Sequence, residues 1–251
     1  MRIAAVQHDI VWEDRDANFA RLAPQVARAV GAGAELVLLT ETFSTGFSMT
    51  PGIGEPEGGP SAQFLAGQAA EHGVWVAGTC PEIGDGEELP HNVFVLAGPD
   101  GSTHRYRKLH PFAAERTRFQ AGTGPVTVEV GGLRITPFIC YDLRFANVFW
   151  AAGPGTDVFL VPANWPSPRR QHWTTLLSAR AIENQAYVVG CNRVGADGTG
   201  LDHAGDSRIV SPTGELLATA SGVETLVIAD VDAAEVAATR DRFRFLADRR
   251  G

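Results

Sequence analysis

The chain of 251 residues is 44% hydrophobic and 20% charged, with a formal net charge of −8. These values predict one globular domain over residues 1–251 and argue against a nucleic-acid partner, because an acidic surface is repelled by phosphates. No run approaches the ~20 apolar residues of a membrane span, and the N-terminus is typical of a first strand rather than a signal peptide, so we expect a cytoplasmic protein.

Strands and helices alternate along the first half of the chain. A strand at residues 2–7 precedes a helix at 16–30, whose apolar residues recur at helical spacing until Gly31 and Gly33 end it. The next expected elements are a strand at 35–40, a helix at 61–72 with Ser61 as its N-cap, a strand at 74–79, and a hairpin of strands 91–97 and 102–107.

Hairpins and buried strands continue through the second half. Expected here are a hairpin of strands 126–130 and 133–140, a strand at 157–162, a helix at 169–185, strands at 187–192, 204–210, 216–218 and 224–230, and a short helix at 233–239. Residues 52–60 and 195–205 are predicted to form long surface loops beside a site. The mixture of hairpins and crossovers predicts an α/β fold in which two sheets pack face to face beneath helices.

Three chemically distinct side chains stand at the ends of predicted strands. Glu41 follows the strand at 35–40, Lys108 follows the strand at 102–107, and Cys140 closes the run 133–140. Strand ends beside loops commonly anchor reacting groups. A thiol, a carboxylate and an amine can act as nucleophile, base and cation, so we predict one catalytic site.

A cysteine nucleophile needs either some thiolate or a base that accepts its proton. Glu41 is the candidate base, and Lys108 can stabilise a thiolate or the negative oxygen of a tetrahedral intermediate, with the Tyr141 backbone N–H as a second donor. Taken singly, a cysteine is more often an inert core residue, which is our interpretation of Cys80 and Cys191. Three widely spaced cysteines predict free thiols and no zinc site.

Three segments resemble the signature motifs of the nitrilase superfamily, the carbon–nitrogen hydrolases with a Glu–Lys–Cys triad. They are LTETF at 39–43, YRKLHPF at 106–112 and ICYDLRF at 139–145, in the family's order. The forms CYDLRF and NWP, the latter at 164–166, are more similar to the ω-amidase-like branch than to true nitrilases. The resemblance implies a four-layer αββα sandwich that pairs into homodimers and needs no metal or organic cofactor.

The resemblance also assigns roles to residues. Glu41 matches the general base, Lys108 the oxyanion-stabilising lysine and Cys140 the nucleophile. Glu115 matches the family's second glutamate, which holds the lysine and positions ammonia or water, although the loop at 113–119 is shorter than in relatives. The implied reaction is hydrolysis of a small amide through a thioester on the cysteine.

A short ω-amide substrate carries a distal carboxylate, which an arginine can bind through two hydrogen bonds. Arg169 or Arg170 is the preferred candidate, whereas Arg144 and Arg180 are expected to pair with internal carboxylates. Other candidates for the carboxylate are Arg193 and Arg208, and the expected pocket residues are Phe47, Tyr141, Asn164 and Trp165.

Two other functions remain open. An N-carbamoyl amino acid amidohydrolase or a nitrilase would use the same triad on a different carbon–nitrogen bond. A catalytically silent scaffold is the third possibility, and the complete triad argues against it. The charged C-terminal segment at 240–251 is expected to pack Phe243 and Phe245 on a neighbouring element or on a partner subunit.

Overall fold

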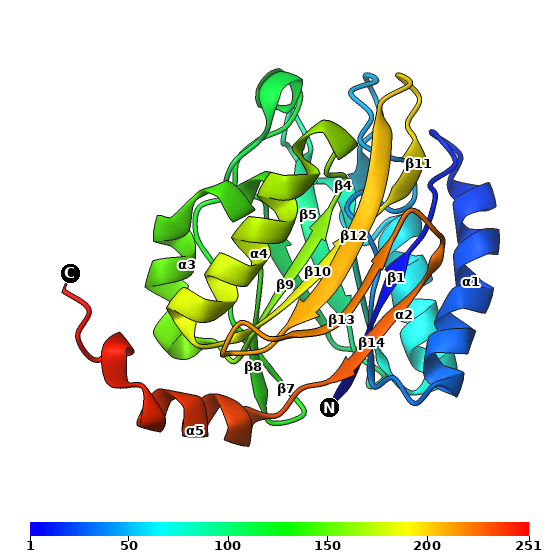
Figure 1. Cartoon of the computed structure of the whole chain (residues 1–251). Helices are drawn as coiled ribbons and strands as arrows, with labels where there is room; N and C mark the ends of the chain where they lie inside the picture. The colour runs from blue at the N-terminus through cyan, green and yellow to red at the C-terminus, as the bar shows by residue number, and fades with distance from the viewer. Residues whose placement is uncertain (251) are drawn as a thin grey trace.

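A computed structural model describes residues 1–250 of the chain. Two seven-stranded β-sheets face each other, and helices cover the outer side of each sheet (Figure 1). Each sheet contains both parallel and antiparallel pairs. The layers therefore follow the order α-β-β-α, which confirms the predicted sandwich.

The first sheet has the strand order β14-β1-β2-β4-β5-β6, with the short β3 paired to β4. Helices α1 (Arg15–Gly31) and α2 (Pro60–His72) cover its outer face (Figure 1). Its strands are β1 (Arg2–Gln7), β2 (Leu36–Leu38), β3 (Glu55–Pro56), β4 (Trp75–Ile83), β5 (His91–Ala97), β6 (Thr103–Arg107) and β14 (Thr225–Asp230).

The second sheet has the order β11-β12-β10-β9-β8-β7, with β13 paired to β12. Helices α3 (Ala146–Ala152) and α4 (Arg170–Asn184) cover it. Helix α5 (Ala233–Arg242) follows β14 of the first sheet. Its strands are β7 (Val128–Val130), β8 (Leu133–Pro137), β9 (Val158–Ala163), β10 (Tyr187–Asn192), β11 (Val194–Ala196), β12 (Asp202–Val210) and β13 (Leu216–Ser221).

In the first sheet, the side chains of β1 and β2 alternate between two apolar cores, so the sheet is buried on both faces. Ile3 and Leu38 belong to the apolar core between the sheets, whereas Ala4 and Val37 belong to the core beneath the helices. Successive side chains of a strand point to opposite faces, so a continuous apolar run suits a strand covered on both sides.

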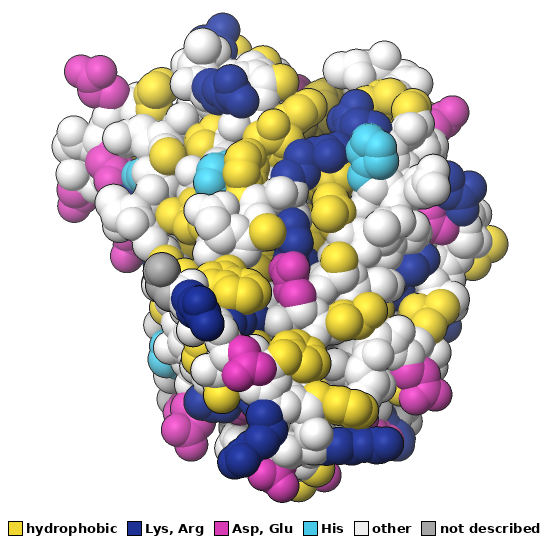
Figure 2. Space-filling model, turned by 60° about the vertical axis from the view of Figure 1, so that its left-hand side comes forward, with side chains coloured by type: hydrophobic (Ala, Val, Ile, Leu, Met, Phe, Trp, Pro, Cys, Tyr) yellow, Lys and Arg dark blue, Asp and Glu magenta, His cyan; other side chains and the backbone are white. Residues whose placement is uncertain are grey.

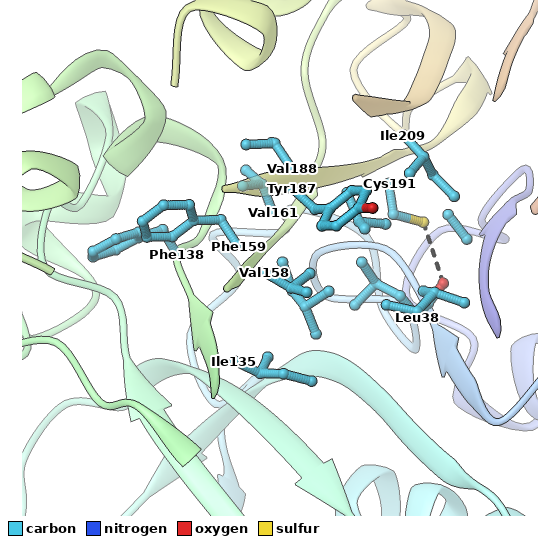
Figure 3. Close-up of a cluster of buried hydrophobic side chains, with 14 of the residues drawn as sticks. Leu38, Ile135, Phe138, Val158, Phe159, Val161, Tyr187, Val188, Cys191 and Ile209 are labelled. Atoms are coloured by element: carbon cyan, nitrogen blue, oxygen red, sulfur yellow. Dashed lines mark hydrogen bonds between the residues drawn. The ribbon is translucent and has the colours of Figure 1, made fainter. Parts of the chain in front are cut away.

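The core between the sheets joins them directly. Figure 3 shows Cys191 of β10 pointing toward Leu38 of β2, and its Sγ donates a hydrogen bond to the Leu38 carbonyl at 3.3 Å. Burial raises the pKa of the Cys191 thiol well above its ordinary value. This cysteine is placed as the inert core thiol that we predicted.

Three local expectations were wrong. The N-cap of α2 is Gly59 rather than Ser61, and the Ser61 backbone N–H instead donates to the buried Glu55 carboxylate at 2.8 Å. Residues 52–60 contain β3 and do not line the cavity around Cys140. Strand β8 ends at Pro137, so the nucleophile candidate lies in the turn beyond the strand.

The C-terminal segment is anchored by its arginines rather than its aromatic residues. Arg240 donates to the carbonyls of Thr156, Gly153 and Asn184, at 2.5, 3.0 and 3.2 Å. Phe243 and Phe245 remain 43% and 45% exposed on this chain. Within residues 1–250, no helix is both long and apolar enough to cross a bilayer.

Candidate active site

A buried ammonium between two buried carboxylates forms the centre of the site. Lys108 Nζ lies 2.8 Å from Glu41 Oε1 and 2.8 Å from Glu115 Oε2, and all three side chains are at most 1% exposed. Burial alone would lower the pKa of Lys108, but the charges of Glu115 and Glu41 raise it above its ordinary value. Lys108 is therefore a permanent cation at this point.

Asn92 of β5 holds both glutamates in place. Its Nδ2 donates to Glu41 Oε1 at 2.9 Å and to Glu115 Oε1 at 3.0 Å. Burial raises the pKa of Glu115, while the charge of Lys108 opposes that rise. A neutral donor shared by two carboxylates reduces the cost of burying an excess of negative charge.

Glu115 also builds the turn in which it lies. Its backbone N–H donates to the Phe112 carbonyl at 2.9 Å, and its Oε2 accepts the Phe112 N–H at 2.7 Å. The same oxygen accepts a hydrogen bond from Lys108. The short loop that we noted in the sequence therefore closes on its own glutamate, and Glu115 contacts Lys108.

Glu41 is positioned by residues from both sheets. After β2 the chain turns at Thr42, which has a φ of 42°, and the Thr42 N–H donates to Thr79 Oγ1 at 2.7 Å. From the second sheet, the Asn164 N–H donates to Glu41 Oε2 at 2.8 Å and its Nδ2 donates to the Glu41 carbonyl at 2.6 Å. The carboxylate is thus fixed against the segment that follows β9.

Cys140 opens a 3-10 turn, Cys140–Arg144, with a φ of +44°. A non-glycine residue in this left-handed region is strained and is kept there by its surroundings. Asp142 supplies that support, because its carboxylate accepts the Ile139 N–H at 3.0 Å, the Tyr106 hydroxyl at 2.8 Å and the His110 N–H at 2.9 Å. The turn that begins at Cys140 is thereby bound to the segment that carries Lys108.

Cys140 is a thiol at rest. Burial, the charge of Glu41 and hydrogen bonding to it raise the pKa of the thiol well above its ordinary value, and Lys108 only partly offsets the rise. Of the two routes open to a cysteine nucleophile, the site therefore favours transfer of the proton to a base during attack. Glu41 is the carboxylate in position to accept it.

Cys140 and Glu41 line a cavity of about 70 Å³. This space suits a small molecule rather than a polymer. The five pocket residues predicted from the sequence all line it, together with six that sequence reasoning did not place there. The predicted five are Phe47, Tyr141, Asn164, Trp165 and Arg169, and the others are Phe112, Arg144, Pro166, Asp197, Leu201 and His203.

The four arginines considered for the substrate carboxylate differ in whether they line the cavity. Only Arg169 among the four lines the cavity, whereas Arg170 is paired with Asp206 at 2.8 Å and Arg193 with Asp9 at 2.7 Å. The fourth, Arg208, donates to the Thr174 carbonyl at 3.4 Å.

The expectation for Arg144 was wrong. It has no carboxylate partner among the described residues. Its Nη2 lies 3.3 Å from His172 Nδ1, and its Cζ lies 4.7 Å from the Trp165 ring centroid. Arg180 does pair internally, with Glu183 at 2.9 Å. The arginine of the ICYDLRF motif therefore faces the cavity instead of an internal acid.

Two of the missed residues left a signal in the sequence. Asn92 is a polar residue in the otherwise apolar strand β5, where a buried amide needs partners. His203 lies within residues 195–205, which we expected to form a long loop beside a site. Asp197, Leu201 and His203 do line the cavity, but both ends of this range belong to strands β11 and β12, so only residues 197–201 form the connecting turn. In the part of the chain that the structure describes, no group of three or more His, Cys, Asp or Glu side chains could hold a metal ion.

The thiol geometry predicts selective alkylation. Iodoacetamide should label Cys140 and leave Cys80 and Cys191 unmodified in the folded protein, because Cys140 lines the cavity whereas the other two are fully buried core residues. Since the pKa of Cys140 is raised, its labelling rate should climb about tenfold per pH unit without levelling off below pH 9. Peptide mass spectrometry checks both points, and a plateau near pH 7 would indicate a resting thiolate instead.

Comparison with known proteins agrees with this geometry. The carbon-nitrogen hydrolase family profile matches residues 2–241. The chain is 37% identical to Omega-amidase YafV of Escherichia coli K12 over 97% of this chain and 94% of that protein, and 32% identical to 2-oxoglutaramate amidase of Bacillus subtilis over 83% and 82%.

A solved structure shares the fold throughout. XC1258 from Xanthomonas campestris, a CN-hydrolase superfamily protein with an arsenic adduct in its active site, superposes with a TM-score of 0.93 at 36% identity, covering 100% of this chain and 97% of that one. The family match and these similarities confirm the resemblance seen in the sequence motifs. The chain belongs to the carbon-nitrogen hydrolase family and is an amidase-type enzyme of the nitrilase superfamily.

Proposed function

We propose that this enzyme hydrolyses the terminal amide of short dicarboxylate monoamides to the acid and ammonia. The carrying observation is a buried thiol beside a Glu–Lys–Glu cluster, in a small cavity whose wall contains two arginines without carboxylate partners among residues 1–250. The similarity to an ω-amidase and to a 2-oxoglutaramate amidase supports the same substrate class.

The first half of the proposed reaction forms a thioester. Cys140 attacks the amide carbon while Glu41 accepts the thiol proton. Lys108 and the Tyr141 backbone N–H bind the oxyanion, and removing one such donor typically costs about 10²–10³ in rate. Collapse of the tetrahedral intermediate transfers the proton to the leaving nitrogen, and ammonia departs.

The second half regenerates the thiol. Glu41 takes a proton from water, which attacks the thioester carbon, and the acid leaves as the proton returns to the Cys140 sulfur. Glu115 acts as a positioning residue, because its two oxygens hold Lys108 at 2.8 and 3.1 Å throughout. The arsenic adduct in the active site of the Xanthomonas relative is in keeping with a reactive thiol at such a site, since arsenic binds sulfur readily.

The two cavity arginines are suited to the distal carboxylate. Arg144 lies over Trp165, and Arg169 lies over Phe112 with its Cζ 5.4 Å from the ring centroid. Stacking holds a guanidinium group flat with its N–H donors at the edge, which favours two-point binding of a carboxylate. One nitrogen of Arg144 also lies 3.3 Å from His172 Nδ1. The remote charge of the substrate would then hold its amide against Cys140.

We also propose that the enzyme is a cytoplasmic homodimer. Its three cysteines are free, as a reducing compartment requires. Figure 2 looks toward the side of α3 and α4, where apolar side chains lie among Lys and Arg. Trp150 on α3, Ile182 on α4 and the nearby Phe243 and Phe245 are each at least 43% exposed, which is typical of an interface.

Ammonia release from a panel of substrates tests the reaction. Succinamate and 2-oxoglutaramate should be hydrolysed, while N-carbamoyl amino acids and aliphatic nitriles should react at least about 100-fold more slowly. The reason is that the two oxyanion donors and the cavity arginines suit an amide with a distal carboxylate. Cys140→Ala should abolish turnover without unfolding the protein, and Cys80→Ala, another buried cysteine, should retain it. Faster turnover of the carbamoyl compounds or nitriles would select those alternative functions.

The carboxylate assignment has its own test. Arg144→Ala and Arg169→Ala should each lower kcat/KM for succinamate by about 10- to 100-fold, mainly through KM, because a hydrogen-bonded charge contributes about 1.5–3 kcal/mol. Butyramide, which has a methyl in place of the carboxylate, should respond by less than about threefold. Arg170→Ala is the matched control, since Arg170 pairs with Asp206. An equal loss on both substrates contradicts the assignment.

Light scattering tests the dimer. The wild type should have twice the chain mass of 26.7 kDa, and Trp150→Glu should yield monomers because it places a charge in the proposed interface. The matched control Val223→Glu alters an exposed residue on the loop before β14 and should leave the mass unchanged. A monomeric wild type at micromolar concentration would refute the assembly.

A further inference from the structure

Trp12 connects two segments of the cavity wall, although it does not line the cavity itself. Its half-buried ring contacts Gly46, in the loop after β2, and Gly198, in the turn between β11 and β12. Phe47, which follows Gly46, lines the cavity. Asp197, which precedes Gly198, lines it as well. One indole ring therefore lies against both segments.

The two glycines allow main chain to lie directly against this ring. A Cβ on Gly46 would lie 2.9 Å from Trp12 Cε3, and a Cβ on Gly198 would overlap Cγ, Cδ2 and Cε2 of the same indole. Glycine suits such close approach because it has no side chain. Rigid main chain against a rigid ring leaves no flexible group that could absorb a shift, so a movement of Trp12 would move the wall.

The main chain around Trp12 is fixed to helix α1 and to the loop that carries Phe47. The Val11 N–H donates to Asn18 Oδ1 at 2.8 Å, and Asn18 Nδ2 donates back to the Val11 carbonyl at 2.7 Å. The Glu13 N–H donates to the Thr45 carbonyl at 2.9 Å. Both neighbours of Trp12 are thus held by hydrogen bonds, which makes its ring a fixed support.

The turn at residues 197–201 is closed on itself. Asp197 Oδ1 accepts the Thr199 N–H at 2.8 Å and the Leu201 N–H at 3.0 Å. The Leu201 carbonyl accepts the Asp197 N–H at 3.0 Å. These bonds make the turn one unit but do not connect it to the loop that carries Phe47. The contact between Gly198 and Trp12 makes that connection.

We infer that Trp12 is a positioning residue that holds these two wall segments at a fixed separation and thereby limits the width of the molecule that reaches Cys140. For amide substrates, this inference rests on the proposed function. The cavity measures only about 70 Å³, so a small displacement of either segment changes what fits. A shift of about 1 Å in a reacting group can cost about 10²-fold in rate.

Two maleimides of different width measure the passage to Cys140 independently of amide turnover. N-methylmaleimide and N-phenylmaleimide add to a thiol by the same reaction, so the ratio of their rates, each taken relative to free cysteine, cancels changes in thiol reactivity. Trp12→Ala should raise the phenyl-to-methyl ratio at Cys140 by about tenfold or more, because the wall loses its support. Trp12→Phe keeps a flat ring and should raise it less than about threefold. Peptide mass spectrometry measures both rates.

Two further variants show whether the effect belongs to this contact. Trp75→Ala is the matched control, because Trp75 is also half-buried, stacks on His104 and does not line the cavity. It should leave the ratio unchanged. Gly198→Ala adds the methyl that overlaps Trp12. It should lower kcat/KM for succinamate by about tenfold in the wild type but by less than about threefold in the Trp12→Ala background.

The outcomes separate this inference from the proposed function. If Trp12→Ala has the wild-type ratio, or if Trp75→Ala raises the ratio as much, Trp12 does not set the width and the inference is wrong, whatever the enzyme hydrolyses. Equal losses from Gly198→Ala in both backgrounds would also contradict it. If the ratio rises as expected while the wild type hydrolyses no ω-amide, the positioning role stands and the proposed function is overturned.

Discussion

The ion-pair cluster of Lys108 with Glu41 and Glu115 determines how the rest of the site is built. Two carboxylates and one ammonium are buried together, and such a group is stable only when each remaining oxygen has a donor. Asn92, the Asn164 N–H and the Phe112 N–H supply those donors. Residues from both sheets therefore surround one charged centre, and the cavity lies beside it, against Glu41 and Cys140.

The turn at Cys140 complements this rigid cluster. The strained backbone of Cys140 is held by Asp142, whose carboxylate also binds Tyr106 and His110 on either side of Lys108. Asp142 thus links the segments that carry Lys108 and Cys140. These two residues are 32 positions apart in the sequence, and so are His110 and Asp142. The Asp142 carboxylate therefore sets where the Cys140 thiol lies relative to the Lys108 ammonium.

Sequence reasoning predicted most of the sandwich because both sheets show their alternation and their turns plainly. The strands at 2–7, 91–97 and 187–192 have the predicted bounds. It could not show that Arg144 turns to the cavity, because whether an arginine pairs with an acid depends on distant packing. Asn92 was missed for a similar reason, since its two partners come from segments 51 and 23 positions away. The cap of α2 was misplaced because a tertiary contact, the Glu55 carboxylate, replaces the local one.

Strand β14 lies beside β1, with Asp230 opposite Arg2, and the Met1 amine donates to the Val231 carbonyl at 2.9 Å. A ribosome therefore delivers the first strand of this sheet long before its neighbour. Until then β1 presents an open edge, a hazard for wrong pairing that a chaperone could shield. The first sheet is therefore completed only once residues 225–230 have been made, well after every residue of the reactive centre.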